Sequence, residues 1–313
     1  MGKIAAVFPG QALMRSGFGL SLISAHPLIN KTVEQIGEVV GRDLVRLCLE
    51  GDEKQLNHAA TVHSLLFALS VGTWLALRAE GFANDRNSVL VGGFSLGEYS
   101  AFCASGGIDL ESCAGLVEER SQLLSIRSDG AMAVVMAEVE RVREVCRKIV
   151  GVDVSALVTS ERTNISGVRG AVEGAIEAFK DLHIEARFIP VDVTSHHPSL
   201  FGVAKLFKAR LMEPRLSEIE IPLVSATVVS VVRKFPGVFR QYLSDQLIRP
   251  VNWIGSVKKM REEGADTFVE IGAVSHLASS IRTIVPEARV FKVTDADTFR
   301  QLITALVAHR ASS

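Results

Sequence analysis

The sequence predicts an α/β fold with a large, mainly parallel sheet covered by helices and a smaller subdomain inserted into it. Short apolar strands alternate with helical segments, the pattern of a parallel sheet that is buried on both faces. Between residues 129 and 198 the order of elements changes. A serine also lies between two glycines where a strand passes into a helix, in Gly93-Phe94-Ser95-Leu96-Gly97.

The strands predicted for the large sheet are short apolar runs: Lys3–Phe8, Val89–Gly92, Pro222–Ala226, Thr267–Ile271 and Arg289–Val293. Apolar periodicity predicts the helices around them near Thr61–Glu80, Leu110–Arg127, Ser199–Met212, Phe235–Ile248, Ile254–Glu263 and Asp297–His309. A sequence compatible with a helix also follows the serine, from Glu98 to Ala104.

The middle of the chain has a βαββαβ order, which is typical of a ferredoxin-like unit. Its elements are expected at Ala131–Met136, Val139–Ile149, Asp153–Val158, Asn164–Gly167, Ala171–Leu182 and Ala186–Val193. We therefore predict a large domain made of residues 1–128 and 199–313 and a small subdomain of residues 129–198. A cleft between two such units is a usual place for a ligand.

Composition excludes several classes of protein. The 313 residues carry a net charge of −1 and no basic run, so nothing indicates nucleic-acid binding. The cysteines, Cys48, Cys103, Cys113 and Cys146, show no C-x-x-C spacing, and no secretory leader is visible, so we expect reduced thiols without a zinc site. The apolar stretch Ser64–Leu77 is too short to span a bilayer and is expected to be a core helix of a cytoplasmic protein.

The turn around Ser95 has the form that exposes a nucleophilic serine in an α/β-hydrolase-like core. Flanking glycines permit close backbone approach, and the amide of Leu96 would point at an oxyanion formed beside the serine. A glycine-rich turn of this kind can also bind phosphate or no ligand at all.

A nucleophilic serine needs a base, and His196 and His197 lie where the small subdomain returns to the large one. Paired histidines in a polar loop are more often simply solvated. His63 lies within an apolar helix, where a hydrogen-bonded core histidine is the simpler interpretation. Gln11 follows the first strand, at the sheet edge where ligands gather. Arg120 lies beside an apolar helical stripe, where an arginine either extends to solvent or holds an anion.

Taken in order, these segments resemble the malonyl-CoA:acyl carrier protein transacylases and the related acyltransferase domains of polyketide synthases, over nearly the whole chain. The segments that carry the resemblance are Phe8-Pro9-Gly10-Gln11, Gly93-Phe94-Ser95-Leu96-Gly97-Glu98, Leu116-Val117-Glu118-Glu119-Arg120, Pro190-Val191-Asp192-Val193-Thr194-Ser195-His196, Gln246-Leu247 with Pro250-Val251-Asn252-Trp253, and Glu270-Ile271-Gly272.

The resemblance implies a role for six residues. Ser95 would be the nucleophile and His196 the base. Gln11 and Leu96 would give the backbone amides of an oxyanion hole, while Arg120 would clamp the malonyl carboxylate and Gln246 would help to shape the histidine site. The implied reaction moves a malonyl or substituted malonyl group from CoA to the phosphopantetheine thiol of acyl carrier protein, with no metal or redox cofactor.

The sequence departs from the family pattern near the expected site. Phe94 replaces a histidine beside the nucleophile, and Ala12 begins a segment that is usually polar. His63 replaces a glutamine, and Val158 removes an asparagine. Gly272-Ala273-Val274 replaces a G-P-G segment. These changes point to a specialised acyl group or acceptor, or to reduced activity.

Two alternatives stay open at this stage: an acyl hydrolase of the same family and a non-catalytic subunit that binds the carrier protein. The expected partners are the carrier protein and a CoA thioester, without nucleic acid or membrane, and a monomer is expected. The sequence does not distinguish fatty acid from polyketide assembly.

Overall fold

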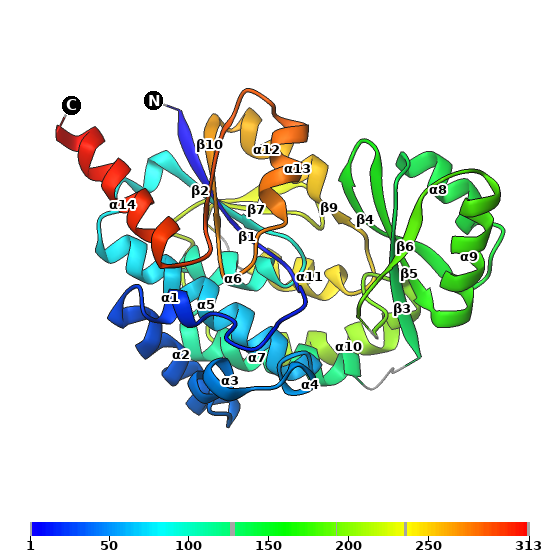
Figure 1. The fold of residues 1–313 in the computed structure, drawn as a ribbon, viewed down its shortest axis with the longest axis horizontal. Helices are drawn as coiled ribbons and strands as arrows, with labels where there is room; N and C mark the ends of the chain where they lie inside the picture. Colours follow the sequence, from blue (N-terminus) through cyan, green and yellow to red (C-terminus); the bar gives the residue numbers. More distant parts are fainter. Residues whose placement is uncertain (1, 126–128, 192, 235–236, 312–313) are drawn as a thin grey trace.

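The computed structural model describes residues 2–125, 129–191, 193–234 and 237–311. Two sheets organise the chain, and Figure 1 shows them side by side. The first is six-stranded, in the order β11 (Arg289–Val293), β10 (Ala265–Ile271), β1 (Lys3–Phe8), β2 (Val89–Gly93), β7 (Leu223–Ser225) and β8 (Ser230–Val232). The second is five-stranded, in the order β6 (Ala186–Ile189), β3 (Gly130–Val135), β5 (Arg162–Val168), β4 (Val152–Thr159) and β9 (Val251–Asn252).

The first five strands of the large sheet, from β11 to β7, are parallel, and only β8 pairs in the antiparallel sense. This arrangement confirms the prediction of an α/β fold with a mainly parallel sheet. The strand β8 was not expected from the sequence, because three residues after a turn give too short a pattern to recognise.

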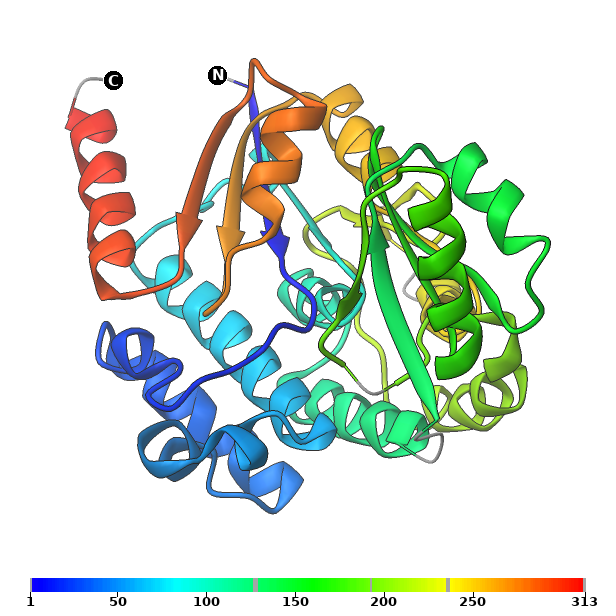
Figure 2. The same ribbon diagram turned by 45° about the vertical axis from the view of Figure 1, so that its right-hand side comes forward.

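Helices surround the large sheet, as Figures 1 and 2 show. Those of the N-terminal half are α1 (Leu20–Ile23), α2 (Pro27–Val40), α3 (Leu44–Glu50), α4 (Glu53–Leu56), α5 (Ala59–Ala79), α6 (Gly97–Ala104) and α7 (Leu110–Ser125). Those of the C-terminal half are α10 (Phe201–Leu211), α11 (Gly237–Gln246), α12 (Trp253–Glu262), α13 (Leu277–Ile284) and α14 (Ala296–Ala311).

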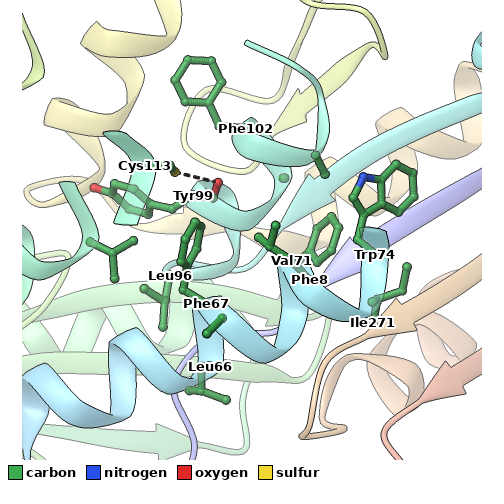
Figure 3. Packing of buried hydrophobic residues seen from close by; sticks show 14 of the residues in the cluster. Phe8, Leu66, Phe67, Val71, Trp74, Leu96, Tyr99, Phe102, Cys113 and Ile271 are labelled. Carbon is green, nitrogen blue, oxygen red and sulfur yellow. Dashed lines mark hydrogen bonds between the residues drawn. The ribbon is translucent and has the colours of Figure 1, made fainter. Parts of the chain in front are cut away.

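Helix α5 runs through the core of the large unit. Among the described residues it is the one helix long and apolar enough to cross a membrane, but 94% of its apolar window is buried inside the protein. Figure 3 shows its Phe67, Val71 and Trp74 among side chains that include Phe8 of β1 and Tyr99 of α6. It is therefore a core helix, as the sequence predicts.

The five-stranded sheet is covered on one face by α8 (Val139–Cys146) and α9 (Arg169–Asp181), which lie on its outer side in Figure 1. Their apolar residues pack against Ala131, Ala133 and Val135 of β3. Four strands of this sheet come from the region predicted to be ferredoxin-like. The fifth, β9, comes from later in the chain and pairs in parallel with Ala156 and Leu157 of β4.

Several predicted boundaries differ from the structure. Strand β6 ends at Ile189, four residues before the expected end at Val193, because Pro190 has no amide hydrogen for the ladder. Helix α8 ends at Cys146 and continues only as turns. Residues 126–127, 192 and 235–236, which fall in expected elements, lie outside the described residues. The subdomain boundaries at 129 and 198 stay a prediction.

Candidate active site

Ser95 lies at the tip of a tight turn between β2 and α6. Its φ of 53° is in the left-handed region, which is unfavourable for a residue with a side chain. The glycines on either side permit the turn, since an added Cβ on Gly93 would lie 2.0 Å from the carbonyl carbon of Gly97. A Cβ on Gly97 would lie 2.0 Å from the carbonyl oxygen of Phe8. The turn is thus wedged against the end of β1, with Ser95 exposed to a cavity.

The structure brings His196 to Ser95, 101 residues earlier in the sequence. The Nε2 atom of His196 lies 2.7 Å from the Oγ atom of Ser95. Its Nδ1 atom lies 2.6 Å from the backbone carbonyl oxygen of Gln246. Because a carbonyl only accepts, Nδ1 carries the proton and Nε2 is free to accept one from the serine.

The loop that carries His196 is fixed from two sides. Ser166 of β5 donates a hydrogen bond of 2.6 Å to the carbonyl of Ser195, and the hydroxyl of Thr194 donates to Gly167. On the other side, the amide of His197 donates to the carbonyl of Leu247 at 3.1 Å. His196 and His197 are 3% and 8% exposed, so the interpretation of this pair as solvated histidines was wrong.

Behind Ser95 lies a buried carboxylate, that of Glu98 on α6. It accepts hydrogen bonds from Ser225, Thr227, the Ala226 amide and the side chain of Gln246. The same Gln246 side chain donates to the carbonyl of Ser95 at 3.0 Å. Glu98 was not predicted to be a site residue, because nothing in its local sequence shows which groups it contacts.

Arg120 projects from α7 into the same cavity as Ser95 and His196. It is 2% exposed, so the alternative that it extends to solvent was wrong. Its guanidinium carbon lies 5.6 Å from the centre of the Tyr99 ring, and its Nε has no hydrogen-bond partner among the described residues. Burial lowers the pKa of this side chain. A buried cation with an unused donor is an anion receptor.

The two backbone amides expected to hold an oxyanion belong to residues that line the cavity beside Ser95, Gln11 and Leu96. Neither amide donates to another backbone group within the described part of the chain. Close approach of the two loops depends on Gly10, since a Cβ there would lie 2.8 Å from the carbonyl oxygen of Phe94.

His63 lines the cavity and is not an ordinary core histidine. Its Nε2 atom lies 2.9 Å from the side-chain oxygen of Gln11, whereas its Nδ1 atom is buried without a partner among the described residues. Burial and the positive charge of Arg120 lower the pKa of His63 to about 3. The same two causes lower the pKa of His196 to about 3. Both imidazoles are therefore neutral at neutral pH.

Phe94, Ala12 and Val158 also lie at the cavity, whereas Gly272-Ala273-Val274 is not part of its described lining. Phe94 packs edge-on against Trp253 and His276, with ring centres 6.0 Å and 6.1 Å apart. Ala12 and Val158 line the wall. The structure adds Asn164 to the lining, so an asparagine does face the site although position 158 lacks one. The cavity has a volume of about 290 Å³. No cluster suited to a metal ion occurs in the described part of the chain.

The sequence matches the family model of the acyl transferase domain over residues 6–298. The chain belongs to this family. The malonyl CoA-acyl carrier protein transacylase of Bacillus subtilis is 26% identical over 316 residues, covering 98% of each chain. The polyketide biosynthesis protein ThaF of Burkholderia thailandensis is 28% identical over 288 residues, and the match covers 90% of this acyl transferase but only 24% of ThaF.

A solved structure shows the same fold. It is described as a type II polyketide synthase acyl-carrier protein in complex with its malonyl-transacylase, PlMCAT:AntF. The match has a TM-score of 0.91 and 28% identity, and it covers 97% of this chain and 99% of that one. The fold of the present acyl transferase is thus shared with a protein whose structure was solved in complex with its carrier.

Proposed function

We propose that this acyl transferase moves a malonyl or substituted malonyl group from CoA to the phosphopantetheine thiol of an acyl carrier protein. The observation that carries the proposal is the 2.7 Å contact between Ser95 Oγ and His196 Nε2 in a cavity that also holds the buried guanidinium of Arg120. The first two groups supply a nucleophile and its base, and the third selects a carboxylated acyl group.

In the first half-reaction, the Ser95 hydroxyl attacks the thioester carbonyl and its proton passes to His196 Nε2. The amides of Gln11 and Leu96 stabilise the negative charge that develops on the carbonyl oxygen. The carbon–sulfur bond then breaks, the CoA sulfur takes the proton from His196, and a malonyl ester remains on Ser95. The Gln246 carbonyl holds the imidazolium that forms between these steps.

Arg120 has a second effect through charge. Its guanidinium contributes to the low pKa of His196. A malonyl carboxylate bound to Arg120 would offset this positive charge, and His196 would become a stronger base. The substrate that carries the correct charge thereby promotes its own reaction, which an acetyl group does not do.

In the second half-reaction, the carrier's thiol gives its proton to His196 and attacks the ester, and the Ser95 oxygen leaves with that proton. All groups in this scheme belong to one chain, so a monomer is sufficient, and no cofactor is required. Unpaired cysteines agree with a cytoplasmic location. Relatives named for malonyl transfer, and the carrier complex described above, support the choice of substrate and acceptor.

The decisive experiment is mass spectrometry of the intact protein after mixing with malonyl-CoA. We expect one malonyl adduct that maps to Ser95 and is absent in Ser95→Ala. Adding carrier protein should remove the adduct and place it on the carrier. An adduct lost equally fast without carrier would identify a hydrolase, and no adduct at all would leave a carrier-binding subunit as the better account.

A further inference from the structure

One wall of the cavity is the face of the five-stranded sheet that α8 and α9 leave open. Alternate residues of β3 line it, Met132 and Val134, while Ala133 and Val135 between them pack under the helices. The same alternation holds on β5 and on the part of β4 after its bulge, as expected for successive side chains on opposite faces of a strand, whereas three successive residues of the edge strand β6 reach the cavity. The lining residues of those strands are Ala156, Val158, Arg162, Asn164, Arg187, Phe188 and Ile189.

Two arginines belong to this wall. Val134 is in register with Asn164 on one side and with Arg187 on the other, and Arg162 lies two residues from Asn164 on the same face of β5. The Nε atom of Arg162 is buried and has no hydrogen-bond partner among the described residues. Within the described parts of the chain, the ion pair of Arg187 is with Glu185, at 3.8 Å, and both side chains are over two-thirds exposed, so water screens this pair.

The charges around the cavity are unbalanced. Its described lining includes three arginines, Arg120, Arg162 and Arg187, and no aspartate or glutamate. Arg187 also lowers the pKa of Arg162, although burial is the larger cause. A single acyl carboxylate needs only one guanidinium, and Arg120 serves it. The two arginines of the sheet are therefore available to a second anionic group.

We propose that Arg162 and Arg187 bind the phosphate at the end of the pantetheine arm, the group that CoA and the acyl carrier protein have in common. This inference rests on the proposed function. With the thioester at Ser95, the arm must leave the cavity along a wall. The apolar residues Met132, Val134 and Val158 suit its aliphatic parts, and the exposed Arg187 on the edge strand β6 marks the outer end.

The test compares substrates that differ in their phosphates. Malonyl-pantetheine has none, malonyl-phosphopantetheine has the one in question, and malonyl-CoA has further phosphates. We expect Arg162→Gln to lower kcat/KM for Ser95 acylation by both phosphate-bearing substrates about tenfold relative to malonyl-pantetheine. Arg187→Gln should act in the same direction but more weakly, because its site is exposed. Transfer to the carrier should slow in parallel.

A matched control is Arg141→Gln, an exposed arginine on α8 beyond the other face of the same sheet. In this variant, the ratios of kcat/KM among the three thioesters should equal those of the unchanged enzyme. Equal losses with all three thioesters would overturn the proposal, as would a loss confined to malonyl-CoA, which would assign the arginines to the outer phosphates. If malonyl-CoA does not acylate Ser95 even in the unchanged enzyme, the proposed function itself fails.

Discussion

Gln246 contacts His196 through its backbone and the Ser95 turn through its side chain. Its carbonyl oxygen lies 2.6 Å from His196 Nδ1, and its amide donates to the Ser95 carbonyl at 3.0 Å. One residue at the end of α11 therefore sets the relative position of nucleophile and base. Glu98 holds that residue in turn, because its carboxylate accepts the other hydrogen bond of the Gln246 amide.

Glu98→Gln should slow Ser95 acylation about tenfold and lower the free energy of unfolding by about 2 kcal/mol. The added amide group would place a donor against one of the four donors that now meet the carboxylate. Rapid-quench acylation by malonyl-CoA should show the loss in the rate constant, with little change in the substrate concentration at half-saturation.

The matched control is Glu270→Gln, because Glu270 is also fully buried and accepts four hydrogen bonds, at the start of α13. It should lose comparable stability while it keeps most of its acylation rate. Equal rate losses in the two variants would show that Glu98 acts only through stability.

Arg120→Ala should lower kcat/KM for malonyl-CoA at least about tenfold, because charge-assisted hydrogen bonds to the carboxylate are lost. Acetyl-CoA should be affected little, since it has no carboxylate to bind. Parallel acylation assays with the two thioesters measure the difference. Equal losses would contradict the clamp and indicate a purely structural role for Arg120.

The two buried histidines make stability depend on pH. The pKa values of His63 and His196 lie near 3 in the folded protein, below the ordinary 6.5. Between these values the unfolded chain binds more protons, so stability is complete above pH 6.5 and is lost as the pH falls toward 3. Each histidine contributes a slope of about 1.4 kcal/mol per pH unit within this window.

His63→Gln should therefore reduce the slope by about one such contribution. Urea unfolding of both proteins at a series of pH values from about 7 to about 5 measures it. Parallel curves for the two proteins would mean that His63 does not titrate on unfolding as its burial requires.

Gly10→Ala tests whether the loop after β1 must lie close to the turn that carries Ser95. The new methyl group would lie 2.8 Å from the carbonyl oxygen of Phe94 and 3.0 Å from its ring, and would push the Gln11 amide away from the oxyanion. We expect acylation to slow tenfold or more, of the order seen when an oxyanion donor is displaced.

Gly174→Ala on α9 is the control for this substitution, because no atom lies within 4 Å of its added Cβ. It should raise stability by about 1 kcal/mol through helix propensity and leave acylation unchanged. Normal acylation in Gly10→Ala would show that the two loops can separate without cost to the reaction.

Much of the fold could be predicted from the sequence, because local runs of apolar residues and glycines mark its strands and turns. Strands β1 and β2 are short and mostly buried apolar runs, and the glycines on both sides of Ser95 mark a tight turn. The two-residue β9 could not be predicted, since it exists only by pairing with β4. No element was predicted in the region of helices α2 to α4. These helices are short or amphipathic segments between polar loops.

The candidate site could be predicted only in part from the sequence. Sequence order and the family resemblance pointed to Ser95, His196 and Arg120, and the structure brings them to one cavity. The burial of the Arg120 and His196 side chains could not be predicted. Elements distant in the sequence cover them, so no local pattern shows that Arg120 is enclosed or that His196 is shielded from water. The contacts of Glu98 depend on neighbours more than 100 residues away, and no spacing in the sequence signals them.

The alternation along β3, β4 and β5 has an evolutionary consequence. Residues that pack under the helices alternate with residues that line the cavity. Substitutions at Met132, Val134, Val158 or Arg162 can accumulate without loosening the packing beneath α8 and α9. New substrates can thus be acquired by changing one surface, while the nucleophile, its base and the residues that hold them stay the same.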